Sequence, residues 1–183
     1  MFGLFKKEPA QPAKPDPARE YFRACNVYCR PEADQAIVAA VYNHGGFMAE
    51  KPGRATLVKF SDSANLHEAI CAALDECEYG EDFNYSDRKK SDWPAYQASG
   101  YKSMKRFEEE FIRLLVQGVN EKNYFYDVTT PEFGEFGLHL TVTVNGYGGD
   151  DYGEAVHYIV KNYLACQAVA SSQRQPGSAS EPA

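Results

Sequence analysis

The chain has 183 residues, of which 44% are hydrophobic and 25% charged, values ordinary for a soluble globular protein with one core-forming domain. Its net charge of −7 disfavours sequence-independent binding to DNA or RNA, because an acidic surface repels phosphates. The same charge suits a basic protein partner, since complementary potentials speed encounter and reject wrong partners.

The sequence lacks the features of a membrane-spanning or secreted chain. No apolar run reaches the length of a transmembrane helix. The apolar residues at 2–5 precede the first lysines, which reverses the order found in a signal peptide. The chain has five cysteines, an odd number, and it is not a small protein. Both facts fit reduced thiols better than a disulfide framework. We therefore expect a cytoplasmic protein without integral membrane association.

Both ends of the chain are poor in residues that could build a core. Residues 6–19 are rich in Pro, Ala and Lys, a composition typical of flexible or polyproline-like segments. We expect a disordered tail over 1–19, a single domain over 20–170 and a second disordered tail over 171–183.

The first predicted elements are a strand and a helix. Residues 21–30 alternate between two faces and predict a strand. Pro31 follows, and proline is tolerated in the first turn of a helix, so we expect a helix over 32–43. The glycine pair at 45–46 would end it.

Two short strands and a second helix come next. Residues 47–50 and 55–60 predict strands that flank a Lys-Pro-Gly turn. The following helix begins at Asp62 or Ser63, because either side chain can cap its first turn. Its apolar face is formed by Leu66, Ile70, Leu74 and Cys77.

Two helices and two strands are predicted in the second half of the domain. Apolar residues recur at spacings of three and four from Met104 to Gly118, the clearest amphipathic helix pattern in the chain. Residues 124–129 and 136–145 predict strands, and the second strand alternates as if one face were buried and the other wet. A final helix over 151–169 has an apolar surface so wide that it implies deep burial or a partner.

Together these elements predict an α+β domain. Their order is β-α-β-β-α, then a long loop, then α-β-β-α. This order predicts a mostly antiparallel sheet of about five strands with helices packed on one face.

The long loop, residues 78–101, is the most informative segment. It holds six aromatic residues, including the only tryptophan, mixed with acidic residues. Loops of this length are usually functional or disordered, and disordered segments are poor in aromatics. Tyr and Trp are enriched at interfaces, so we expect this loop to bind a partner. The alternative is a loop that folds back and buries its aromatics against its own domain.

A second acidic turn, residues 146–154, joins the best strand to the last helix. Its glycines match neither a dinucleotide-binding motif nor a P-loop, and either aspartate could simply cap the helix. A metal-assisted hydrolase or transferase is the other interpretation, with Asp150, Asp151, Glu154 and His157 as its ligands. The second half-site of a di-metal bundle is absent, so we expect no catalytic residue, metal or cofactor.

The cysteines Cys25 and Cys29 would share one face of the first strand. Their spacing is not the usual zinc pattern. We expect both to be small buried hydrophobic residues. A nucleophilic cysteine needs a base beside it, and nothing in the sequence fixes a histidine there.

Our leading functional hypothesis is a non-catalytic cytosolic module that binds a basic protein partner. In its acidic charge, compact α+β character, aromatic loop and lack of a catalytic motif, the chain resembles bacterial immunity proteins and antitoxins in style, although no residue motif links it to a family. The alternatives are the metal-dependent enzyme and a structural or assembly protein that associates through its last helix. The expected binding residues are Tyr85, Asp87, Asp92, Trp93, Tyr96, Tyr147, Asp150 and Asp151. The oligomeric state is not predicted.

Overall fold

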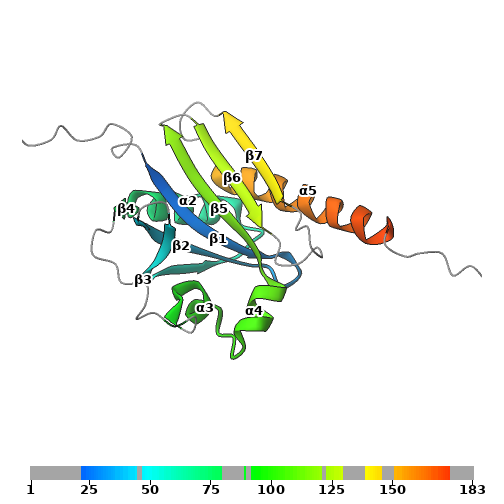
Figure 1. Ribbon diagram of the computed structural model, residues 1–183, viewed down its shortest axis with the longest axis horizontal. Coiled ribbons are helices and arrows are strands. Elements are labelled where there is room, and N and C mark those ends of the chain that lie inside the picture. Colours follow the sequence, from blue (N-terminus) through cyan, green and yellow to red (C-terminus); the bar gives the residue numbers. More distant parts are fainter. Residues whose placement is uncertain are drawn as a thin grey trace, which may run out of the picture.

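The chain folds around one largely antiparallel sheet (Figure 1). The computed structural model describes residues 22–44, 47–79, 89, 92–120, 123–129, 139–145 and 151–173. The strands are β1 (Arg23–Arg30), β2 (Gln35–His44), β3 (Phe47–Val58), β4 (Glu78–Tyr79), β5 (Ile112–Asn120), β6 (Asn123–Thr129) and β7 (His139–Asn145). Their order is β3-β2-β1-β5-β6-β7, and neighbours along it are antiparallel. β4 pairs in parallel with the end of β2.

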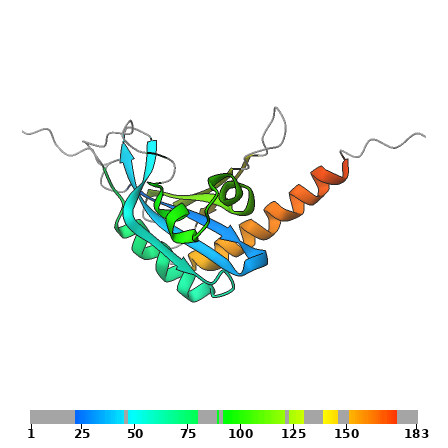
Figure 2. The same ribbon diagram turned by 90° about the horizontal axis from the view of Figure 1, so that it is seen from below.

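Helices cover both faces of this sheet. They are α2 (Ser63–Asp75), α3 (Pro94–Ser99), α4 (Met104–Glu110) and α5 (Tyr152–Gln173), with a 3-10 turn, η1, at Pro31–Ala33. Figure 2 shows the long helices α2 and α5 on one side of the sheet and the short helices α3 and α4 on the other. The predicted α+β class and mostly antiparallel sheet are confirmed. The sheet has seven strands rather than about five, and the short helices do not join the long ones on one face.

The short helices α3 and α4 cover the second face of the sheet because the strand residues on that face are apolar. Tyr28 on β1 and Ile37 and Ala39 on β2 are buried on the side away from the long helices. Leaving them in water would forfeit the hydrophobic stabilisation of burial. Ala95 of α3 and Phe107 of α4 pack against them and form a second, smaller core.

The predicted helix over 32–43 is wrong, because only η1 is helical and β2 follows it. Asp34 turns the chain between them with a positive φ of 52°. Its carboxylate accepts hydrogen bonds from the backbone N–H and the hydroxyl of Ser61, which hold the pKa of this carboxyl below its ordinary value. The apolar run 36–41 is buried on both faces of the strand, so it shows no alternation.

The predicted amphipathic helix from Met104 to Gly118 is also wrong. α4 ends at Glu110 and the chain then enters β5. Phe107 lies in the second, smaller core, whereas Leu114 lies in the main core across the sheet, so their helical spacing does not mark one helix face. From Leu114 onward the buried residues recur at a period of two, as expected of a strand.

Several other elements follow their predictions. The strand predicted over 21–30 is β1, and those predicted over 124–129 and 136–145 are β6 and β7. The helix predicted to begin at Asp62 is α2. The Asp62 carboxylate accepts a hydrogen bond from the backbone N–H of Asn65 (3.1 Å) and so caps the first turn.

The strands predicted on either side of the Lys-Pro-Gly turn are one strand, β3. Its register with β2 shifts between the Ala39–Ala55 and Val41–Glu50 pairs, and the turn residues bulge out between them. β3 is the last strand at its end of the sheet order. Pro52 lacks a backbone N–H, and at this edge position it removes no hydrogen bond from a central pair of strands.

The last predicted helix, 151–169, is α5, which continues to Gln173. The predicted tail 171–183 therefore begins inside this helix. Residues 174–183 and the predicted tail 1–19 lie outside the described residues. None of the described helices is both long and apolar enough to cross a membrane.

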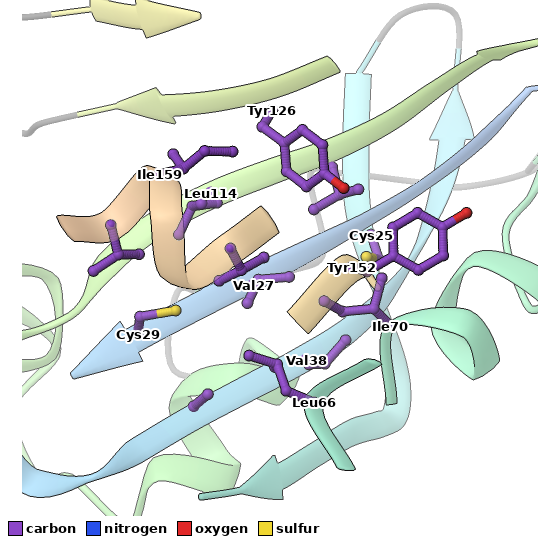
Figure 3. Packing of buried hydrophobic residues seen from close by; sticks show 14 of the residues in the cluster. Cys25, Val27, Cys29, Val38, Leu66, Ile70, Leu114, Tyr126, Tyr152 and Ile159 are labelled. Carbon is purple, nitrogen blue, oxygen red and sulfur yellow. The ribbon is translucent and has the colours of Figure 1, made fainter. Parts of the chain in front are cut away.

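The main core lies between the sheet and the two long helices (Figure 3). The side chains labelled there come from four strands and both helices: Cys25, Val27, Cys29, Val38, Leu66, Ile70, Leu114, Tyr126, Tyr152 and Ile159. Cys25 and Cys29 are fully buried, and burial raises the pKa of both thiols well above the ordinary value. Their prediction as small buried hydrophobic residues is confirmed.

Candidate functional site

Half of the residues predicted to bind a partner lie in the described part of the chain. These are Asp92, Trp93, Tyr96 and Asp151. The others, Tyr85, Asp87, Tyr147 and Asp150, lie outside it, and their role stays a prediction. The described residues do not share a face: the first three belong to or precede α3 on one side of the sheet, and Asp151 precedes α5 on the other.

The described end of the aromatic loop packs on its own domain. Trp93 is half-buried just before α3, and its carbonyl accepts the first helical hydrogen bond, from Gln97 (3.0 Å). The ring of Tyr96 meets Phe107 edge to face at 5.7 Å, and Tyr101 meets Phe111 in the same way at 5.7 Å. For these tyrosines, the alternative in which the loop buries its aromatics against its own domain describes the structure.

A buried carboxylate holds α3 against the sheet. Glu50 on β3 is only 5% exposed, and it accepts hydrogen bonds from the Asn26 amide (3.1 Å), the Tyr28 hydroxyl (2.5 Å) and the Ala95 N–H (2.9 Å). Burial, followed by the charge of Glu50, raises the pKa of Tyr28 well above its ordinary value. These three contacts are internal, so Glu50 positions α3 and the adjoining Trp93.

Asp151 caps the last helix, as one of the two interpretations of the acidic turn expected. Its Oδ1 accepts hydrogen bonds from the backbone N–H groups of Gly153 (3.0 Å) and Glu154 (3.1 Å) and from the Ser63 hydroxyl (3.3 Å). The His157 ring meanwhile bonds to the carbonyl of Phe60. Within the described residues, no group of three or more His, Cys, Asp or Glu side chains could hold a metal ion.

A cysteine and a histidine on α2 resemble a nucleophile with its base. Cys71 Sγ lies 3.5 Å from His67 Nε2. However, His67 Nδ1 accepts a hydrogen bond from the backbone N–H of Tyr152 (3.0 Å). In a neutral imidazole the ring proton is then on Nε2, which faces the sulfur as a donor. Burial, then the nearby Asp75, raises the pKa of the Cys71 thiol. In this tautomer Nε2 cannot accept the thiol proton, and the raised pKa of Cys71 disfavours its thiolate, so the pair lacks the activation that a cysteine nucleophile needs. His67 instead joins α2 to α5.

The remaining candidate is a cleft of about 450 Å³ between α4 and α5, at the end of the sheet where β1 stops and β5 begins. The lining residues are Arg30, Glu32, Glu108, Glu109, Glu110, Phe111, Ile112, Tyr163, Leu164 and Gln167. They come from three separate stretches of the chain, so the fold alone brings them together. Its size is within the range of pockets that hold small molecules or side chains.

One corner of the cleft is occupied by the internal partners of Glu110. The Glu110 carboxylate forms an ion pair with Arg30 (2.7 Å) and accepts hydrogen bonds from Arg106 (2.7 Å) and the Tyr101 hydroxyl (2.5 Å). The Tyr101 hydrogen bond, followed by that of Arg106, lowers the pKa of Glu110 below its ordinary value. Glu110 therefore fastens the end of α4 to β1 and to the segment before α4, and the two arginines more than offset its charge.

The rest of the cleft is acidic above an apolar floor. The described lining residues carry four glutamates and one arginine, a formal sum of −3. Glu32 and Glu109 are exposed and Glu108 is half-buried, while the floor includes Phe111, which is only 5% exposed. Such a site offers contact area together with a field that favours cations.

The sequence did not reveal this cleft because the glutamate run at 108–110 lay within the helix predicted from Met104 to Gly118. Its one signal was the position of that run between two phenylalanines, Phe107 and Phe111. Comparisons of the chain with protein-family models, with curated proteins and with solved structures find no significant match.

Proposed function

We propose that the protein is a non-catalytic module that binds a basic protein partner, and that the cleft between α4 and α5 receives part of that partner. The acidic rim above an apolar floor is the observation that carries this proposal. The apolar floor would supply contact area, and the glutamates would steer a positively charged segment and reject acidic ones. The cleft suits a side chain or short segment rather than a whole domain.

The finer form of the proposal is an immunity-type or antitoxin-type inhibitor in the cytoplasm. An inhibitor of this kind needs a field of one sign and a few rigid anchors rather than catalytic groups. The net charge of −7 supports the field. Trp93, held next to α3 by the Glu50 hydrogen bonds, is the anchor that the loop offers.

The two alternatives have less support. For the metal-dependent enzyme, Asp151 already caps α5 and His157 already bonds to a carbonyl. For the assembly protein, the wide apolar surface of α5 finds its partner inside the molecule, because Val156, Ile159 and Val160 are buried in the main core. Neither alternative has a feature comparable to the acidic cleft.

Affinity capture from the source cells, using wild-type protein and matched charge variants, tests the proposal. The cleft variant carries Glu32→Gln and Glu108→Gln, and the control carries Glu68→Gln and Glu154→Gln, which remove the same charge from exposed sites on α2 and α5. We expect wild type and control to retain one basic protein that the cleft variant loses. Equal recovery by both variants, or no basic protein with wild type, would contradict the proposal.

A separate arm tests the predicted loop. Trp93→Ala is expected to weaken the captured complex by about 2 kcal/mol or more, the scale of an interface hot spot. If Trp93→Ala has no effect while the cleft variant does, the partner occupies the cleft without reaching α3.

A further inference from the structure

We infer that the protein forms a symmetric dimer in which the outer edges of two β3 strands pair antiparallel with each other. β3 is the last strand at its end of the sheet (Figure 1), and no described strand pairs with its outer side. An exposed strand edge presents backbone donors and acceptors that another extended segment can use. The dimer goes beyond the proposed function, because the described lining of the cleft between α4 and α5 contains no residue of β3.

The two halves of this edge differ in how well they are protected. Lys51, Pro52 and Gly53 bulge out of the register with β2, and bulges, lysine and proline are features that keep strand edges from pairing. The second half, 55–58, keeps a regular register with β2 and carries Leu57, which is 51% exposed. The protection therefore stops where the strand becomes regular, and this second half is open to pairing.

Hydrogen bonding within the chain determines which backbone groups of this second half face outward. The N–H of Phe60 donates to the carbonyl of Asp34 (3.2 Å), in line with the register of β3 on β2. Backbone groups alternate between the two edges of a strand, so those of Thr56, an even number of residues earlier, also face β2. The N–H and carbonyl groups of Ala55 and Leu57 therefore face the outer edge.

These outward groups are complementary to those of a second copy of the chain. When a two-fold axis passes at Thr56, Ala55 of each copy lies opposite Leu57 of the other, and the two residues exchange both backbone hydrogen bonds. About four backbone hydrogen bonds then join the two sheets. Thr56 meets Thr56 of the other copy in the closely spaced position between these pairs, where β-branched side chains pack well.

The side chains around the axis suit this register. Leu57 lies on the side of the sheet that α3 and α4 cover, since its register partner on β2 is buried in the second, smaller core. There it would meet the small side chain of Ala55 from the other copy. Arg54 would lie opposite Val58 of the other copy, so like charges do not face each other, and its guanidinium is already paired with Glu76 (3.4 Å).

The pairing closes at two copies. The bulge at 51–53 limits the open ladder on one side, and on the other the chain turns after β3, where the carbonyl of Lys59 accepts the N–H of Asp62 (3.3 Å). Two-fold pairing uses the outward groups of 55–57 in both strands. An interface of this kind, in which the same surface serves both copies, gives a dimer rather than an open chain of molecules.

Analytical ultracentrifugation of the full chain, at concentrations from micromolar to submillimolar, tests the inference. We expect wild type to be in equilibrium between monomer and dimer. Leu57→Pro removes an outward N–H and leaves the hydrogen bonds to β2 in place, so the dissociation constant of the dimer should rise about ten-fold or more. The control is Tyr158→Lys, which changes the 67% exposed tyrosine of α5 and should match wild type.

Disulfide trapping tests the register in the same protein. In a Cys166→Ser background, which removes the exposed thiol, Thr56→Cys places one cysteine of each copy in the closely spaced position, where a disulfide can form. Arg54→Cys in the same background is the control, because its two copies would lie about 13 Å apart along the strands, too far for a disulfide. We expect an oxidised dimer from Thr56→Cys and none from Arg54→Cys.

Three results would overturn the inference. A chain that is monomeric at every concentration would leave the edge of β3 to an extended segment of another protein. A dimer that Tyr158→Lys abolishes and Leu57→Pro leaves intact would assign the association to α5. Equal trapping by Thr56→Cys and Arg54→Cys would contradict the two-fold register. Melting curves check that each variant is folded, and the trapping experiment decides the question if Leu57→Pro is not.

Discussion

The two ends of α5 use similar side chains for different purposes. At its start, Asp151, Ser63 and His67 bond to one another or to backbone groups and join α5 to α2. Near its other end, Leu164 and Gln167 line a cleft with glutamates from α4. Polar groups at the start of the helix are satisfied inside the molecule, and some carboxylates of the cleft are too: Glu109 pairs with Lys105 (3.6 Å), and Glu110 pairs with Arg30 and Arg106. Residue types with catalytic potential are structural at the first end, and a plain glutamate run lines the cleft at the other.

The junction of α2 with α5 is expected to give the largest effect. A Cβ atom at Gly153 would lie 2.2 Å from the backbone carbonyl oxygen of Ser63, a contact that neither helix can relieve by rotating a side chain. We expect Gly153→Ala to lower the free energy of unfolding by about 3 kcal/mol, measured by urea denaturation. Gly53→Ala is the matched control: nothing lies within 4 Å of its Cβ, and only its positive φ opposes alanine. Equal losses from both changes would mean that the helices do not meet closely at Gly153.

The buried carboxylate under α3 should give the next largest effect. Glu50→Gln replaces an acceptor by an amide whose NH2 group would face the Tyr28 hydroxyl or the Ala95 N–H, both of which are donors. We expect a loss of about 2 kcal/mol in unfolding free energy, the cost of burying an unsatisfied donor. Tyr28→Phe, which removes a donor and leaves the carboxylate in place, should cost less, about 1 kcal/mol. A neutral Glu50→Gln would show that this carboxylate is not needed to hold α3.

The corner of the cleft around Glu110 predicts a pH dependence of stability. Because hydrogen bonds from Tyr101 and Arg106 lower the pKa of Glu110 in the folded protein, this carboxylate stabilises the fold above its ordinary pKa of 4.5. That contribution is lost as the pH falls through the lower, folded-state pKa. Glu110→Gln should therefore be less stable than wild type at neutral pH, and the difference should shrink below pH 4.5. A difference that is constant with pH would contradict this assignment.

Glu32 and Glu108 of the cleft should have the smallest effect on stability. Glu32→Gln and Glu108→Gln are expected to change the unfolding free energy by less than about 0.5 kcal/mol, as surface substitutions usually do. The same pair is expected to weaken binding of a basic partner, which separates the function of the cleft from its contribution to the fold. If this pair were as destabilising as Glu50→Gln, the cleft glutamates would be structural.

Sequence patterns correctly predicted those elements in which apolar residues recur at a single spacing, either helical or alternating. α2 was predicted because Asp62 caps it and its apolar face keeps helical spacing, and β1 because its residues alternate. β2 escaped prediction because helices cover both of its faces, which removes alternation from 36–41. β5 was hidden because Phe107 and Leu114, on opposite sides of the sheet, happen to lie at helical spacing.

The candidate site was less predictable than the fold. The cleft draws on three stretches of chain whose meeting depends on β5 being a strand rather than a helix, so the wrong helix concealed it. The capping of α5 by Asp151 was foreseen, since that role depends only on neighbouring residues. Glu50 gave no signal, because its partners Asn26 and Ala95 are distant in sequence.

Mapping by NMR where a basic peptide binds, a capped dodecapeptide in which serine alternates with arginine, tests the central claim most directly. In a titration of isotopically labelled full-length protein, the account predicts that backbone amide shifts concentrate on 108–112 and 163–167, the two sides of the cleft. The Glu32→Gln and Glu108→Gln variant should lose these shifts. Shifts concentrated on 92–98 around α3, or the same shifts in the variant, would contradict the account.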